Sequence, residues 1–136
     1  MTNSGDELRI AADQIISTDL KDTALIKSAI LRIFSESGSN IFLTSDMALI
    51  NNGEKSLTFS KNVILKTNDK MEITAPKIFT SLDKTLIQAD GPIKGFFGKS
   101  NIQAGQLNIS KENNSAHLVI SFTKGVKMVY DVSQSF

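Results

Sequence analysis

The feature that most constrains the fold of this chain is a short pattern that occurs four times. Each copy has an apolar residue, a small residue two positions later, a residue with special backbone properties, and then an apolar residue two positions further on. The copies are IAADQIIS from Ile10, LTSDMALI from Leu43, ITAPKIFT from Ile73 and IQAGQLNI from Ile102. Successive small residues are 33, 30 and 29 positions apart. This spacing is typical of stacked supersecondary units.

The alternation within each copy predicts a β-strand with one buried face, because side chains two residues apart lie on the same face. The alternation shifts by one residue at the special position, which is Asp13, Asp46, Pro76 or Gly105. The shift would turn every later side chain to the other face unless a residue is left unpaired, as in a β-bulge or a corner. Proline suits such a position because it has no ladder donor to lose, and glycine tolerates unusual φ values. The strands are therefore predicted to be kinked near their middle.

Turns and returning apolar runs follow the copies. Residues 51–55 (NNGEK) are a strong hairpin signal, and residues 81–84 and 111–115 form two further turns. The returning runs are interrupted at residues 61–62, 90–92 and 124–125. Each unit is therefore predicted to be a hairpin whose two strands both bend.

The first unit is less regular, and residues 19–34 fit two structures. Ile26, Ile30, Ile33 and Phe34 lie on one stripe of a possible helix. However, Ile30 follows Ala12 at the distance at which Val63 follows Ser45 and Ile93 follows Ala75. We favour a strand for this segment.

The predicted fold is all-β: a twisted, open β-jelly roll built from about four repeated kinked hairpins, because kinked strands let a sheet fold over itself. The 136 residues are enough to bury a core, so one domain is expected over residues 1–136. A hydrophobic content of 40% and a charged content of 21% are ordinary for a globular protein.

The sequence offers little for catalysis or metal binding. The chain has no cysteine, and its single histidine, His117, follows a predicted turn and is expected on the surface. Glu72, Asp83 and Asp90 could in principle pair as glycosidase carboxylates, but they fall in turns or on the predicted outer face. The glycine-spaced run from Gly91 lacks the Gly-Lys-Ser/Thr ending of a phosphate loop. We predict no enzyme activity, no cofactor and no metal.

Charge and hydropathy give no sign of nucleic-acid binding or of a membrane-spanning helix in these residues. The net charge is +1, with basic and acidic residues interspersed, which gives no reason to expect nucleic acid. No segment approaches the roughly 20 apolar residues that cross a bilayer as a helix.

The order of these motifs resembles one known family. The four repeats, the segment ADGPIKGFFGKSNIQAGQLNI (residues 89–109) and the closing run FTKGVKMVYD (residues 122–131) together resemble the periplasmic domain of the lipopolysaccharide-export family LptC. More distantly, they are similar to the OstA-like repeats of LptA and of the N-terminal domain of LptD. The resemblance covers roughly residues 8–131. It rests on the order of short motifs rather than on any single one.

This resemblance implies a specific role. Members of the family are held to the inner membrane by one N-terminal helix, receive lipopolysaccharide from the LptB-LptF-LptG transporter and pass it to LptA. We therefore expect a periplasmic location, with an anchor helix preceding this sequence. By the same resemblance, Gly105 matches a glycine near the region where LptA docks, and the strand from Val126 through Val129 to Tyr130 matches the edge to which LptA adds. The transporter would then bind at the N-terminal edge of the sheet. A homodimer that forms through the unpaired edge strands is a further alternative.

Lipid A needs a continuous apolar surface if its acyl chains are to move through water. The residues predicted to face inward, and so the candidates to line such a groove, are Leu43, Phe59, Ile73, Ile78, Ile102, Leu107, Ile109, Ile120, Phe122 and Met128. Alternatively, these side chains fill a dry core. Three other functions stay open: a soluble LptA-like bridge, a structural β-repeat module without a lipid ligand, and a carbohydrate-active β-solenoid enzyme.

Overall fold

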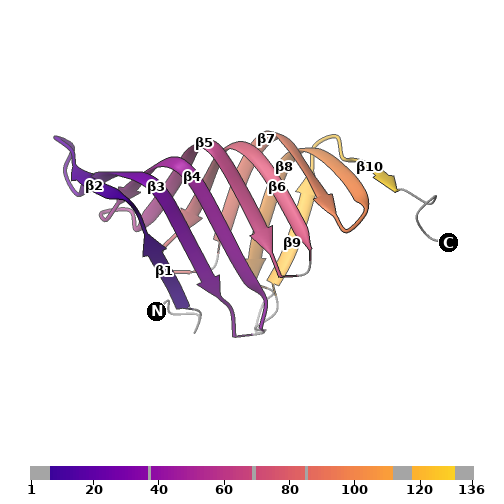
Figure 1. The fold of residues 1–136 in the computed structure, drawn as a ribbon, viewed down its shortest axis with the longest axis horizontal. Coiled ribbons are helices and arrows are strands. Elements are labelled where there is room, and N and C mark those ends of the chain that lie inside the picture. Colours follow the sequence, from indigo (N-terminus) through magenta and orange to yellow (C-terminus); the bar gives the residue numbers. More distant parts are fainter. Residues whose placement is uncertain (1–6, 37, 69, 85, 112–117, 131–136) are drawn as a thin grey trace.

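In the computed structural model, the chain forms one antiparallel sheet that bends over on itself (Figure 1). The structure describes residues 7–36, 38–68, 70–84, 86–111 and 118–130. Over these residues the strands are β1 (Glu7–Ala11), β2 (Gln14–Ser17), β3 (Thr23–Phe34), β4 (Asn40–Asn51), β5 (Ser56–Thr67), β6 (Met71–Ser81), β7 (Leu86–Phe97), β8 (Ser100–Lys111), β9 (Leu118–Thr123) and β10 (Lys127–Tyr130). The prediction of an all-β, open jelly-roll fold is confirmed.

The strands follow one another across the sheet in chain order. The path is β1-β3-β4-β5-β6-β7-β8-β10, with β2 also paired to β3 and β9 also paired to β8. β1 and β2 lie at one end of the molecule, and β9 and β10 lie at the other (Figure 1). Each strand from β3 to β8 passes through the bend, so its two halves belong to different walls. Wall A contains β1, β10 and the halves of β3–β8 between them, and wall B contains β2, β9 and the other halves.

The bends lie where the sequence predicts them. The register shifts in β4 between Thr44 and Met47, around Asp46, and in β5 between Ser60 and Val63. In β6 the ladder to β7 is interrupted from Thr74 to Phe79, and in β7 the ladder to β8 is interrupted from Asp90 to Ile93. In β8, Gly105 is the residue that has no partner in β7. The predicted interruption at residues 124–125 separates β9 from β10.

Side-chain hydrogen bonds stabilise the first of these bends. Asn62 Nδ2 donates to Asp46 Oδ2 at 2.7 Å, and Ser45 Oγ donates to the carbonyl oxygen of Met47 at 2.7 Å. Lys61 and Asn62 have positive φ values of 65° and 55°, which asparagine accepts more readily than most residues do. An aspartate at the special position therefore has a physical role, because it ties the bend of β4 to the bend of β5.

The ambiguous first unit is a strand, as favoured. β3 spans Thr23–Phe34 and pairs with β4 along both halves, with Ser28 left out of the ladder at a φ of 56°. The predicted turns at residues 51–55 and 81–84 also lie between strands. His117 and most of the predicted turn at residues 111–115 lie outside the described residues.

The core lies between the two walls. It is built from aliphatic side chains of both walls together with Phe59, and small residues such as Ala29, Ala48 and Ala104 line its bend. Within the described part of the chain, the Thr80 hydroxyl is buried in this core without a hydrogen bond. Thr80 faces the core beside Leu57 and Ile87.

We expect the Thr80→Val substitution to raise the free energy of unfolding by about 1 kcal/mol, because it removes an unsatisfied buried hydroxyl and preserves the side-chain shape. Thr44→Val is the matched control on the partly exposed outer face of wall A, and its effect should stay within about 0.5 kcal/mol. Urea unfolding of both variants measures this. A loss of stability in Thr80→Val would mean that the hydroxyl is bonded after all.

Candidate functional site: an apolar inner face between two open edges

Two rows of apolar residues run across the inner face from one edge to the other. Residues directly opposite each other on paired antiparallel strands lie on the same face, so the register defines each row. The wall A row is Ile10, Leu31, Leu43, Leu65, Ile73, Gly95, Ile102 and Met128. The wall B row is Ile15, Ile26, Ala48, Phe59 and Ile78, and beyond the unpaired stretch between β6 and β7 it continues with Ala89, Leu107 and Phe122. Apart from Ile102, the buried members of both rows belong to one core cluster.

Burial changes along these rows. The central members, such as Leu43 and Phe59, are fully buried. The end members are not: at the N-terminal edge Ile10 is 39% and Ile15 63% exposed, and at the C-terminal edge Met128 is 55% exposed. The apolar inner face is therefore closed by packing in its middle and reaches solvent at both edges.

The structure brings the predicted groove residues onto this one face. Leu43, Phe59, Ile73, Ile78, Ile102, Leu107 and Ile109 are buried in the core, Ile120 and Phe122 are half-buried, and Met128 is exposed. All ten occupy inward register positions. In this structure the central side chains pack against one another, so at those positions the residues fill a core, as in the alternative to a lipid groove.

The predicted docking residues lie at or beside the C-terminal edge. Val129 and Tyr130 are in β10, which pairs with β8 on one side, and no strand of the described chain pairs with its other side. Val126 lies in the bend that leads into β10, and both valines are more than half exposed. An edge of this kind can accept a strand from another chain.

Gly105 lies at the bend of β8, one strand in from that edge. A Cβ atom at Gly105 would overlap the carbonyl oxygen of Lys124 and lie 2.8 Å from the Cβ of Lys124. Lys124 itself lies between β9 and β10. Gly105 therefore allows the C-terminal segment to pack closely against β8, so it positions the C-terminal edge rather than forming part of it.

The N-terminal edge carries apolar residues that the predicted groove set does not include. Ile10 and Ile15 face the interior from β1 and β2, and Leu20, in the turn after β2, is 68% exposed. Ile10 and Ile15 occupy the two apolar positions of the first sequence repeat. The same alternation that predicts the inward-facing residues of the other repeats therefore predicts these two as well.

The three candidate catalytic carboxylates lie on separate parts of the surface. Glu72, on the outer face of wall A, pairs with Lys66 at 3.4 Å. Asp83 accepts a hydrogen bond from Ser81 at 2.8 Å in the turn after β6, and Asp90 accepts one from Gln106 at 3.3 Å on the outer face of wall B. Among the described residues, no three His, Asp or Glu side chains are grouped so that they could hold a metal ion. The described part of the chain also contains no helix able to cross a bilayer.

Comparison with known proteins identifies the family. The sequence matches the family model described as lipopolysaccharide-assembly, LptC-related, over residues 1–131. No curated protein matches it significantly. Among solved structures, the fold is similar to that of LptH from Pseudomonas aeruginosa, described as the LptA-homologous periplasmic component of the lipopolysaccharide transport device. That similarity has a TM-score of 0.66 at 10% sequence identity and covers 96% of this chain and 99% of LptH, so it shows a shared fold. The family match spans nearly the whole chain and confirms the resemblance seen in the sequence: this protein belongs to the LptC-related family of lipopolysaccharide-assembly proteins.

Proposed function

We propose that the domain carries the acyl chains of lipopolysaccharide along its inner face, from the edge formed by β1 and β2 to the edge formed by β9 and β10. Family membership supports a role in lipopolysaccharide transport in general. In this proposal the LptB-LptF-LptG transporter delivers lipid at the N-terminal edge, and LptA receives it at the C-terminal edge. The domain then works in the periplasm, tethered to the inner membrane by an N-terminal helix, and performs no chemical reaction.

One observation carries the proposal: apolar rows cross the whole inner face and end in exposed apolar side chains at both edges. Burying a methylene group of an acyl chain contributes about 0.8 kcal/mol, so a chain leaving one end of the face gains by entering the next module. Ile15 in β2 and Met128 in β10 supply such exposed positions at opposite ends of the sheet. Because the middle of the face is filled by its own side chains, lipid reaches it only when the two walls move apart.

A photo-crosslinking amino acid at inner and outer positions tests the route. We expect lipopolysaccharide adducts from Phe122, which is half-buried near the open C-terminal end, and from Phe59 and Ile78 at the centre. Phe42 is the control, because it is an aromatic residue on the outer face of wall A and should give no adduct. The absence of an adduct from all three inner positions would exclude the relay.

A charged substitution tests the C-terminal edge. We expect Val129→Asp to weaken the binding of LptA at least about tenfold, equivalent to about 1.4 kcal/mol, because the exposed valine on the edge strand becomes covered when a strand adds. Leu49→Asp is the control, since Leu49 is an exposed apolar residue on the outer face of wall B, in a strand that is paired on both sides and so lies away from either edge. Titration of both variants with LptA measures the affinity. If the Val129→Asp variant and the unsubstituted domain bind LptA with equal affinity, β10 is ruled out as the docking strand. Self-association through the same edge would appear as dimers of the domain in the absence of LptA.

A further inference from the structure

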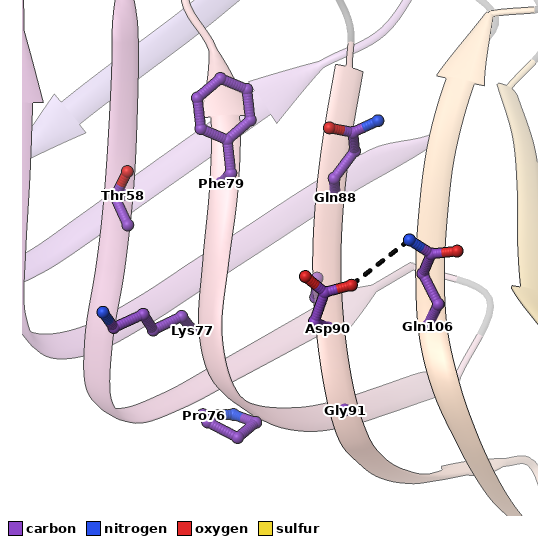
Figure 2. Close-up of a pocket in the computed structure, with 9 residues that line it drawn as sticks. Thr58, Pro76, Lys77, Phe79, Gln88, Asp90, Gly91 and Gln106 are labelled. Atoms are coloured by element: carbon purple, nitrogen blue, oxygen red, sulfur yellow. Dashed lines mark hydrogen bonds between the residues drawn. The ribbon is translucent and has the colours of Figure 1, made fainter. Parts of the chain in front are cut away.

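A hollow of about 550 Å³ lies on the outer face of wall B, on the opposite side of the sheet from the apolar interior. Its polar and aromatic lining comes from four adjacent strands (Figure 2): Thr58, Lys77, Phe79, Gln88, Asp90 and Gln106. Thr58, Phe79 and Gln88 form one row across β5, β6 and β7. Neither the acyl-chain route nor the two edges use this surface.

The hollow exists because β6 and β7 separate at the bend. Their pairing stops at Thr74 with Lys94 and resumes only at Phe79 with Gln88, which leaves residues 75–78 of β6 and 89–93 of β7 unpaired with each other. The equivalent gap between β7 and β8 is much shorter. Pro76 has no N–H to pair across the gap. Gly91 lies close against β8 instead, where a Cβ atom would come within 2.9 Å of the Gly105 carbonyl oxygen. The surface therefore sinks between the two strands.

Two polar groups of the hollow, Asp90 and Gln106, are joined to each other and to Thr123 by a chain of hydrogen bonds. Gln106 Nε2 donates to Asp90 Oδ1 at 3.3 Å (Figure 2). Thr123 Oγ1 in turn donates to Gln106 Oε1 at 3.2 Å. These bonds fix the orientation of the Gln106 amide and hold the Asp90 carboxylate. An ionised carboxylate accepts several hydrogen bonds, so Asp90 has acceptor capacity beyond Gln106. The Lys77 ammonium and the Gln88 amide add donors, and Thr58 adds a hydroxyl group.

This set of groups matches the chemistry of a sugar ring. A hexose or hexosamine presents vicinal hydroxyl groups, which suit a carboxylate and planar amides, and an apolar C–H face, which suits an aromatic ring such as that of Phe79. A phosphate group fits less well, because the one cation of the hollow, Lys77, is accompanied by the Asp90 carboxylate. An acyl chain would leave the polar groups unpaired. The volume lies within the usual range of small-ligand sites, about 300–1,000 Å³.

We propose that this hollow binds hexose or hexosamine units of an oligosaccharide, with Phe79 stacking on the ring and Asp90, Gln88 and Gln106 binding its hydroxyl groups. The site goes beyond the proposed acyl-chain route, because it lies on the other face of the sheet and needs no lipid. The sugar can come from two sources, the saccharide portion of lipopolysaccharide or a β-1,4-linked N-acetylhexosamine glycan.

Titration of the isotope-labelled domain with two lipid-free glycans, followed by NMR, tests the site. The probes are the core oligosaccharide released from lipopolysaccharide and chitotetraose, each at millimolar concentration. We expect amide shifts confined to β5–β8 around Phe79 with at least one probe, and the responding probe identifies the source. Failure of both probes, or shifts confined to the inner face, would overturn the proposal.

Variants make the assignment specific. Phe79→Ala and Asp90→Asn should each weaken glycan binding at least about tenfold, since the first removes the ring on which the sugar stacks and the second removes the negative charge that strengthens hydrogen bonds from its hydroxyl groups. Phe42→Ala, on the outer face of wall A, is the control and should bind glycan normally. The NMR spectrum of each variant reports whether it is folded. If Phe79→Ala does not fold, Asp90→Asn, which keeps the side-chain shape, tests the site alone. Undiminished binding in a folded variant contradicts the assignment. Because the glycans carry no acyl chains, the result is independent of crosslinking at Phe122.

Discussion

Replacing Gly105 with alanine is expected to release β9 and β10 from the sheet while β3–β7 stay paired. The added methyl group would overlap the Lys124 carbonyl oxygen, a backbone atom that can yield only if the segment between β9 and β10 moves. Overpacking of this kind typically costs about 1–3 kcal/mol. Hydrogen exchange should become faster for the amides of residues 118–130 than for those of the central strands. The affinity for LptA should fall in parallel if LptA docks at the proposed C-terminal edge, because that edge is displaced.

Gly98→Ala is the matched control for this experiment. Gly98 has a left-handed backbone, with a φ of 61°, but a Cβ atom there would meet nothing within 4 Å. Its substitution should cost about 1–2 kcal/mol from backbone strain alone. It should leave the exchange of residues 118–130 relative to the central strands unchanged. Equal protection of those residues in Gly105→Ala and in the unsubstituted domain would show that close packing at Gly105 does not hold the edge.

Replacing Phe59 with alanine is expected to cause a large loss of stability. Phe59 is fully buried in the wall B row, between Ala48 and Ile78 on the adjacent strands. Truncation of a buried phenylalanine costs about 3–5 kcal/mol, because the surrounding side chains close the resulting cavity only in part. That is a large share of the roughly 5–15 kcal/mol that stabilises a typical domain. Denaturant unfolding should show a clearly lower midpoint with an unchanged slope.

Phe96→Ala provides the comparison for this truncation. Phe96 is on the outer face of wall A and 54% exposed, so its truncation should change stability by no more than about 0.5 kcal/mol. If Phe59→Ala were equally mild, the interior at this position would be loosely packed or solvent-filled rather than a dry core. The pair of measurements therefore also tests how tightly the middle of the inner face is packed.

The positions of the bends could be predicted from the sequence because they depend on local backbone chemistry. A proline without an N–H, a glycine and an aspartate each interrupt the alternation at one place, and that place is fixed along the chain. Pro76 and Gly105 lie at irregular points of their ladders, as expected. The inward face of each strand follows from the same alternation.

The degree of burial could not be predicted in the same way, because it depends on the place of a strand within the sheet. Met128 and Ile102 lie opposite each other on the inner face, yet Met128 is exposed, because only β8 lies beside its strand. The outer hollow could not be predicted for a related reason. Lys77, Asp90 and Gln106 lie far apart in the sequence and become neighbours only where β6 and β7 separate.

The continuity of β3–β8 through the bend restricts how the two walls can move. Each of these strands belongs to both walls, so neither wall can slide along the other without breaking six covalent connections. The remaining freedom is a change of angle at the line of bends, as when a book opens about its spine. Residues with left-handed backbones, among them Ser28, Lys61 and Asn62, lie along that line. Any widening of the interior is therefore a rotation about the line of bends, and its largest displacement falls at the rims farthest from it, among the turns that join the strands.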